Sequence, residues 1–170
     1  MKKRILICIV CAIMSLLALQ GCKNNLEKAE GNTCISDEVW CNPSYLPDDI
    51  DQTRVRMLNI PGYQQYVYLS TDSSNRLVID IQKEKNITVD SADATDIDIG
   101  SHEGSCYIYN GESMNYGDLS ENITSRLTKI ALDEIVIEWD QANVFCRVFG
   151  TYPIDEMVKI AKNVEVYIYD

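Results

Sequence analysis

The chain has 170 residues, of which 46% are hydrophobic and 24% are charged, and its formal net charge is −11. This length suits one folded domain with a sizeable core. An acidic chain of this kind is a poor binder of nucleic acid or anionic lipid through its general electrostatic field, so these two partner classes are not expected.

Residues 1–21 have the three parts of a bacterial secretion signal. Residues 2–4 are basic, residues 5–19 form an apolar run, and the small residue Gly21 closes the segment. As a helix the apolar run is about 22 Å long, which is too short to span a hydrocarbon core of about 30 Å. The sequence therefore predicts a signal peptide over residues 1–21.

The stretch Leu19-Gln20-Gly21-Cys22 resembles the lipobox of bacterial lipoproteins. In that family the cysteine becomes the mature N-terminus and carries lipid. The resemblance implies that Cys22 anchors the protein in the cell membrane, on its extracytoplasmic face. Two alternatives are cleavage without lipidation and an uncleaved anchor. Loss of the three basic residues would shift the net charge from −11 to −14.

The polar residues 22–33 show no apolar periodicity, so they predict a tether between the lipidated Cys22 and a single extracytoplasmic domain, residues 34–170. Eleven extended residues reach roughly 35–40 Å. An exported protein often carries disulfides, and the spacing favours Cys34 with Cys41 and Cys106 with Cys146. The alternative for the second pair is two buried thiols.

The domain begins with many turn signals over residues 34–62, where we expect irregular structure. Alternating β-branched and aromatic residues then predict short strands. Strands so close in sequence are expected to pair antiparallel. The expected strands cover residues 63–70, 76–82, 86–90, 96–99 and 105–110.

Residues 111–131 predict a loop with a short helix, and residues 134–139 and 143–150 predict a β-hairpin. A helix over about residues 153–163 follows, with its apolar stripe at Ile154, Met157, Val158 and Ala161. A last strand is expected over residues 164–168. Together these elements predict an α+β fold in which a meander-like antiparallel sheet packs against one or two helices.

The segment Ile135–Val164, IVIEWDQANVFCRVFGTYPIDEMVKIAKNV, carries a strand ending in Trp139, a strand with Phe145, then Gly150 and a helix. This pattern resembles the C-terminal signature of the family called domain of unknown function 4367, over residues 60–163. The resemblance implies a curved antiparallel sheet with helices on its concave side, similar to half of the lipoprotein-carrier fold. The family supplies no catalytic residues that could be carried over.

No motif in the chain predicts a metal or cofactor. The single histidine, His102, lies in an expected surface turn without a nucleophile-elbow motif nearby. The acidic residues Asp90, Asp93, Asp96 and Asp98 lack the spacing of a calcium loop, so a solvated turn is the favoured interpretation.

Five aromatic residues, Tyr107, Tyr109, Trp139, Phe145 and Phe149, form a candidate apolar face, although aromatic residues on strands usually mark a half-buried sheet. The sequence favours a non-enzymatic binding module that contacts an envelope protein, with its oligomeric state open. The alternative is a carrier or sensor of a lipid-like ligand. That alternative requires an open concavity, and a core filled by Trp139, Phe145 and Phe149 would argue against it.

Overall fold

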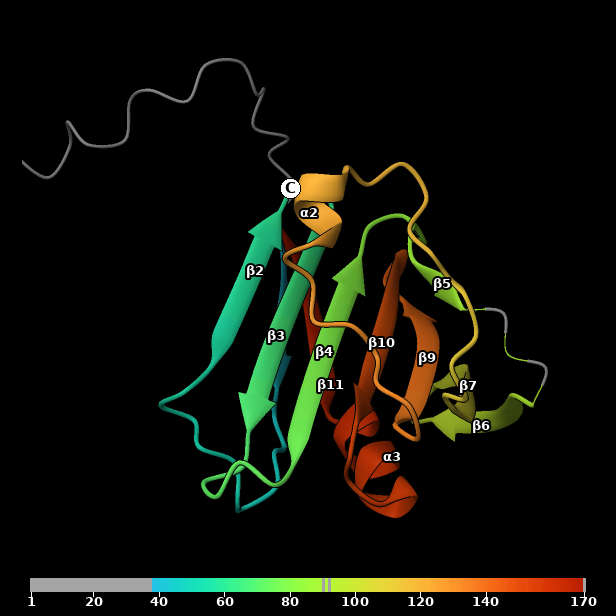
Figure 1. Cartoon of the computed structure of the whole chain (residues 1–170). Coiled ribbons are helices and arrows are strands. Elements are labelled where there is room, and N and C mark those ends of the chain that lie inside the picture. The colour runs from blue at the N-terminus through green and yellow to red at the C-terminus, as the bar shows by residue number, and fades with distance from the viewer. Residues whose placement is uncertain (1–37, 90, 92, 170) are drawn as a thin grey trace, which may run out of the picture. The chain divides into compact units, whose positions relative to one another are not determined.

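A seven-stranded antiparallel sheet organises the residues described by the computed structural model, which are residues 38–169 without 90 and 92 (Figure 1). These residues belong to one compact unit, Ile35–Asp170. In spatial order the sheet contains β2 (Arg56–Ile60), β3 (Tyr63–Leu69), β4 (Arg76–Gln82), β10 (Val144–Gly150), β9 (Ile135–Gln141), β7 (His102–Ile108) and β6 (Thr95–Ile99).

Two-residue turns set the register of two hairpins in this sheet. Pro61 and Gly62 join β2 to β3, and Gly62 has φ 74°, as the third position of a type II turn requires. Ala142 and Asn143 join β9 to β10 with φ values of 52° and 62°, which matches a type I′ turn. Ala142 therefore adopts a left-handed backbone that alanine rarely takes.

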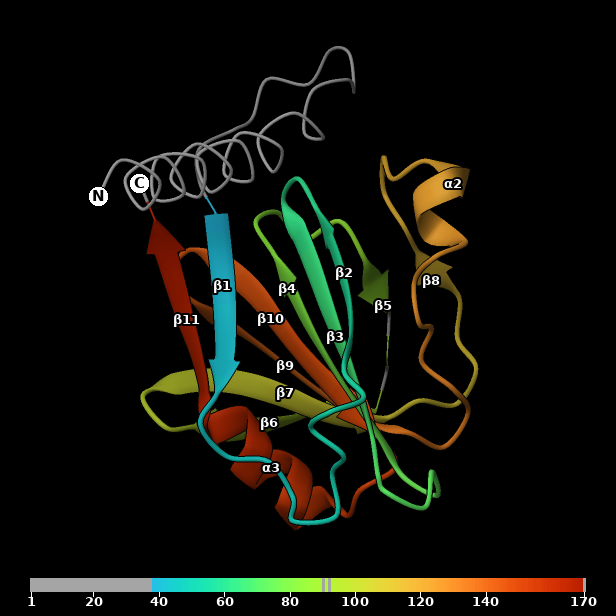
Figure 2. The same cartoon turned by 90° about the vertical axis from the view of Figure 1, so that its left-hand side faces the viewer.

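One face of the sheet, called the inner face below, is covered by α3 (Ile154–Lys162) and by a two-stranded ribbon of β1 (Glu38–Pro43) and β11 (Val164–Tyr169) (Figure 2). Met157, Ile160 and Ala161 of α3 are buried against this face. They share one core cluster with Trp139 of β9 and with apolar side chains of β4 and β10. This cluster fills the space between the sheet and the helix.

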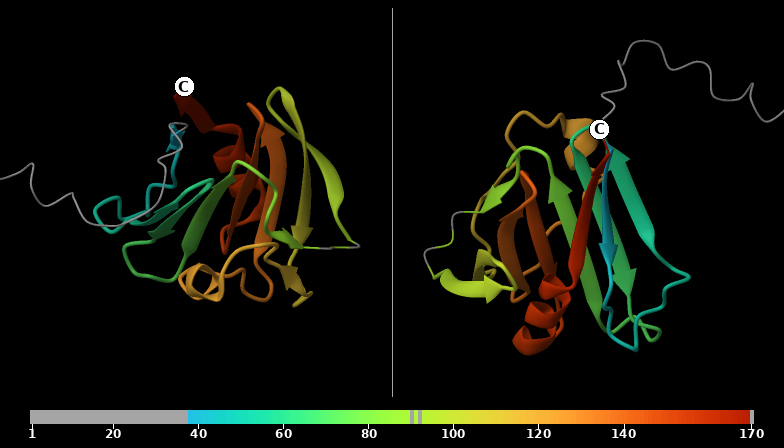
Figure 3. Two further views of the ribbon diagram at one scale, coloured as in Figure 1. Left: turned by 90° about the horizontal axis from the view of Figure 1, so that it is seen from above. Right: turned by 180° about the vertical axis from the view of Figure 1, so that it is seen from behind.

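The opposite face, called the outer face, is covered by residues 111–133, which contain β8 (Met114–Asn115) and α2 (Glu121–Thr124) (Figure 3). Ile130 shares a core cluster with Phe149 and Val78, and Leu127 belongs to a neighbouring cluster. The short strand β5 (Thr88–Val89) pairs with β8 and ties this segment to the chain after β4. The sheet is thus buried on both faces.

The structure confirms the α+β class, and α3 lies within the helix expected over residues 153–163. Residues 34–62 were expected to be irregular, yet they contain β1 and β2. β7 begins at His102, so the turn expected there is confined to Gly100 and Ser101. The strand order departs from a simple meander because β10 pairs with β4 as well as with β9.

The expected signal peptide, lipidated Cys22, tether and Cys34 lie outside the described residues. Within residues 38–169, where the structure describes them, no helix is long and apolar enough to cross a membrane.

Candidate functional site

A row of polar side chains crosses the centre of the outer face. Gln65 of β3, Asp80 of β4, Arg147 of β10 and Glu138 of β9 lie opposite one another in register. The Arg147 side chain is fully buried; its Nε donates to Glu138 Oε1 at 2.7 Å and its Nη2 donates to the Ile87 carbonyl at 2.7 Å. Its Nη1 lies 3.8 Å from Asp80 Oδ2. This row is a buried ion cluster.

Burial sets the electrostatics of this cluster. Loss of water raises the pKa of Asp80 to about 6, although Arg147 and the amide of Gln65 oppose the shift. Burial would lower the pKa of Arg147, but the Glu138 and Asp80 carboxylates outweigh it and raise that pKa. The cavity beside Asp80 has a volume of about 10 Å³, enough for about one water. The cavity beside Asp80 therefore has no room for a substrate.

A second ion pair fastens the outer segment to the sheet. Both carboxylate oxygens of Glu134 accept hydrogen bonds from Arg76, with Nη2 to Oε2 at 2.6 Å. Arg76 Nη2 also donates to the Lys129 carbonyl at 2.9 Å, and the Ala131 amide donates to Glu134 Oε2 at 2.7 Å. A bidentate arginine–carboxylate pair gives strong directional anchoring, so it fixes where residues 111–133 return to the sheet.

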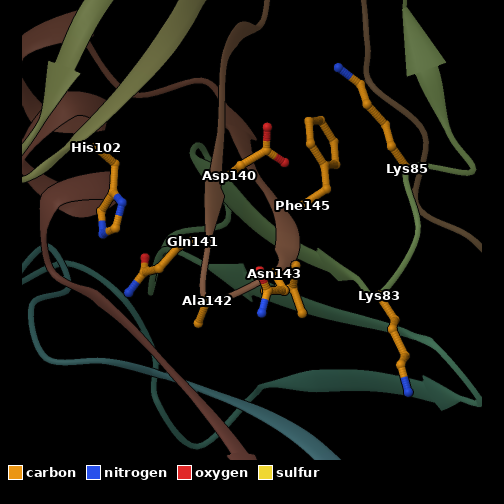
Figure 4. A pocket seen from close by; sticks show the side chains of 9 residues that line it. Lys83, Lys85, His102, Asp140, Gln141, Ala142, Asn143 and Phe145 are labelled. Atoms are coloured by element: carbon orange, nitrogen blue, oxygen red, sulfur yellow. The ribbon is translucent and has the colours of Figure 1, made fainter.

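A polar hollow of about 570 Å³ lies at the tip of the β9–β10 hairpin (Figure 4). Lys83, Lys85 and His102 line it, yet Figure 4 shows the two lysine side chains pointing in opposite directions and His102 on the far side. Lys85 instead lies over the Phe145 ring, with its Nζ 4.3 Å from the ring centroid. The two lysine ammonium groups and the His102 ring do not converge on one point, so this hollow lacks the arrangement of an anion site.

An apolar groove of about 530 Å³ lies where β7, the start of β9 and the start of α3 meet. Ile108 and Ile135 are paired across β7 and β9, and Ile154 is the first residue of α3. Ile108 and Ile154 are 60% and 49% exposed, whereas Cys106 at the same groove is buried. This volume is within the range of pockets that bind small molecules or side chains, about 300–1,000 Å³. The groove is the best candidate for a binding site in the described part of the chain.

The five aromatic residues proposed as one apolar face lie on two faces. Trp139 belongs to the inner core, whereas Tyr107, Tyr109 and Phe149 belong to a core cluster on the outer face. Phe145 lies on the outer side too, beside Arg147, whose guanidinium carbon is 5.3 Å from its ring centroid. Trp139 pairs with Cys146, and alternation along β10 then puts Phe145 and Phe149 on the opposite side. The prediction of one shared face was wrong.

The predicted Cys106–Cys146 bridge is also wrong. Both thiols are free and buried, as is the thiol of Cys41. Cys106 is on β7 and Cys146 on β10, and β9 lies between them. Strands are about 4.8 Å apart, so two strand spacings exceed the Cα separation that a disulfide spans. Burial raises the pKa of Cys41 to about 12 and also raises the pKa values of Cys106 and Cys146.

Sequence reasoning did not identify the groove. Ile154 was assigned to the buried stripe of its helix, but the structure buries Met157, Ile160 and Ala161 and leaves Ile154 half exposed. Among the described residues, no group of three or more histidine, cysteine, aspartate or glutamate side chains is placed to hold a metal ion.

The fold and the groove define an α+β domain in which an antiparallel sheet holds a helix on one face. The chain belongs to the family described as domain of unknown function (DUF4367), whose model matches residues 41–164. This match begins in β1, earlier than the expected residue 60, and includes all seven strands of the main sheet and α3. Searches of curated proteins and of solved structures gave no match. The likeness to lipoprotein carriers stays a prediction.

Proposed function

We propose that this protein is a lipid-anchored, extracytoplasmic binding module that contacts its partner through the apolar groove. The observation that carries the proposal is the exposure of Ile108 and Ile154 at a concave site next to buried core residues. Fully burying one such side chain stabilises a complex by about 1.5–3 kcal/mol. The lipobox at Cys22 supports the location, because a lipidated cysteine would hold the domain at the membrane surface.

A non-enzymatic role agrees with the placement of the titratable groups. Asp80 has a pKa of about 6, near the range useful for proton transfer, but it is enclosed beneath residues 111–133. The polar hollow is accessible, yet its charged side chains diverge. The groove is apolar and contributes shape and burial, which are the properties that a binding site needs.

Lipidation is tested by mass spectrometry of the detergent-extracted mature chain, with Cys22→Ser and Cys34→Ser compared in parallel. We expect the wild type and Cys34→Ser to be in the membrane fraction with the mass of a diacylglyceryl group. Cys22→Ser should lose both properties. An unmodified Cys22 in the wild type would refute the anchor.

The second candidate function is transport or sensing of a lipid-like molecule, and the apolar lining of the groove favours it. The filled inner core, with Trp139, Met157 and Ile160 between sheet and helix, limits such a ligand to the groove itself. Native mass spectrometry of the same sample distinguishes this second function from protein interaction. A co-purifying adduct of lipid size would support the carrier, and a bare domain would favour protein interaction.

A further inference from the structure

Among the described residues, the groove coincides with the place where strand pairing ends at one edge of the main sheet. β6 begins at Thr95, which lies opposite Cys106, whereas β7 continues to Ile108 and pairs there with Ile135 of β9. In the described register no residue of β6 lies opposite Ile108. β7 thus runs past the end of its outer neighbour, on the side where the groove opens.

The backbone of Ile108 points toward this edge. The Tyr109 amide donates to the Glu134 carbonyl at 2.9 Å, and the Asp133 amide donates to the Tyr109 carbonyl at 2.8 Å, so both groups of Tyr109 point toward the β9 side. Successive residues of a strand direct their amide and carbonyl to opposite sides. The amide and carbonyl of Ile108 therefore point outward, to where an added strand would pair.

The charges around the groove are acidic. Asp93 lines it, and no lysine, arginine or histidine is among its lining residues. Asp155 follows Ile154 in the first turn of α3. Asp96 and Asp98 are exposed on β6 as well, but strand alternation puts them on the outer face, away from the groove isoleucines. The whole chain is acidic as well, with a net charge of −11, so a second copy of it would be repelled. The complementary occupant is cationic.

We propose that the groove binds an extended, lysine- or arginine-rich segment of a partner protein that adds to β7 beside Ile108. One aliphatic side chain of that segment packs against Ile108, Ile135 and Ile154, and its basic neighbours lie near Asp93. Backbone pairing at a sheet edge supplies direction, and the pocket for an alternate side chain supplies specificity. This inference rests on the proposed binding function and names the chemistry of the partner.

The test uses the full chain and three capped hexapeptides, measured by isothermal titration calorimetry. The first alternates lysine with valine, the second alternates glutamate with valine, and the third is the lysine peptide with N-methylated valine amides. We expect the lysine peptide to bind, and the glutamate and N-methylated peptides to bind at least tenfold more weakly. Added salt should weaken the binding of the lysine peptide, because salt screens the attraction between exposed charges. Equal binding of the lysine and glutamate peptides, or no binding of the lysine peptide, would overturn the inference.

The variants Ile108→Ser and Ile154→Ser locate the site. Ile108 is mostly exposed and Ile154 is half exposed, so the fold should persist in both variants, which far-ultraviolet circular dichroism checks. The matched control is Met57→Ser, because Met57 is 49% exposed on β2, the opposite edge strand. We expect each isoleucine variant to lose about tenfold in peptide affinity and the Met57 variant to lose none. An equal loss in all three, or no loss in the isoleucine variants, would place the peptide elsewhere and refute the proposal.

An uncharged amphiphile separates this inference from the function on which it rests. Octyl glucoside below its micellar concentration is titrated while the methyl resonances of Ile108 and Ile154 are followed by NMR. If octyl glucoside shifts these resonances and the lysine peptide does not bind, the peptide inference fails and the groove remains a binding site. If neither probe binds, both proposals fail.

Discussion

Arg147→Met removes the cation at the centre of the buried ion cluster while keeping most of the side-chain volume. The substitution leaves Glu138 and Asp80, both nearly inaccessible to solvent, without their shared partner. It also leaves the Ile87 carbonyl without the guanidinium donor that contacts it at 2.7 Å. Breaking a buried pair by removing one partner costs about 3–5 kcal/mol. The free energy of unfolding of a domain of this size is about 5–15 kcal/mol, so the variant should lose a large share of its stability.

Urea denaturation at pH 7 measures this loss through tryptophan fluorescence, to which Trp139, buried in the native core, contributes. The single variant Glu138→Gln and the double variant complete a cycle that isolates the interaction. We expect the double variant to be more stable than the sum of the two losses predicts, by about 0.5–3 kcal/mol. A loss below about 1 kcal/mol for Arg147→Met, or strict additivity, would show that the cluster is solvated and would refute this account of it.

Three further predictions concern single side chains. Burial raises the pKa of Asp80 to about 6 in the folded chain, above the 3.8 of an unperturbed aspartate, so the free energy of unfolding falls as pH rises between these two values. In urea titrations, the stability of Asp80→Asn relative to wild type should therefore rise by about 2–3 kcal/mol between pH 3.8 and pH 7, and a constant difference would contradict this. Gly150→Ala would place a Cβ against the Arg76 carbonyl, so we expect the free energy of unfolding to fall by about 1–3 kcal/mol. An unchanged melting temperature would disprove this close approach. Ala142→Gly relieves a positive φ and should stabilise the hairpin by about 0.5–1 kcal/mol in thermal denaturation; destabilisation would argue against a left-handed Ala142.

Local sequence patterns predicted where the strands and helices lie in the chain better than they predicted which strands pair with one another. Period-two alternation located β3, β4 and β10, and the apolar stripe of residues 154–161 located α3. β1 was missed because it ends at Pro43 and other turn-forming residues follow it closely. Its partner strand, β11, lies at the other end of the described chain. Strand order depends on such long-range pairing, and hydrophobic spacing within one segment does not encode it.

The buried ion cluster did leave a signal in the sequence. Asp80, Glu138 and Arg147 each lie in a strand otherwise made mainly of apolar or aromatic residues, in the segments LVIDIQ, IVIEW and FCRVF. Charges at such positions are rarely fully buried unless they are paired, so opposite signs on neighbouring strands indicate a buried pair. The sequence could not show which strands were neighbours, and the groove was missed for the same reason, because its residues come from four separate segments.

The ion cluster and the groove are linked through strand register. The pairing of Arg147 with Glu138 fixes β10 against β9, and the same row continues to Ser105 of β7. Three residues further along this strand pair, Ile135 lies opposite Ile108 at the groove. A slip of one residue would move every side chain to the other face, placing a carboxylate in the inner core and the groove isoleucines on the outer face. The cost of burying a lone charge in the inner core therefore opposes that slip. In this way the ion cluster on the outer face fixes the strand register that places the groove isoleucines on the inner face.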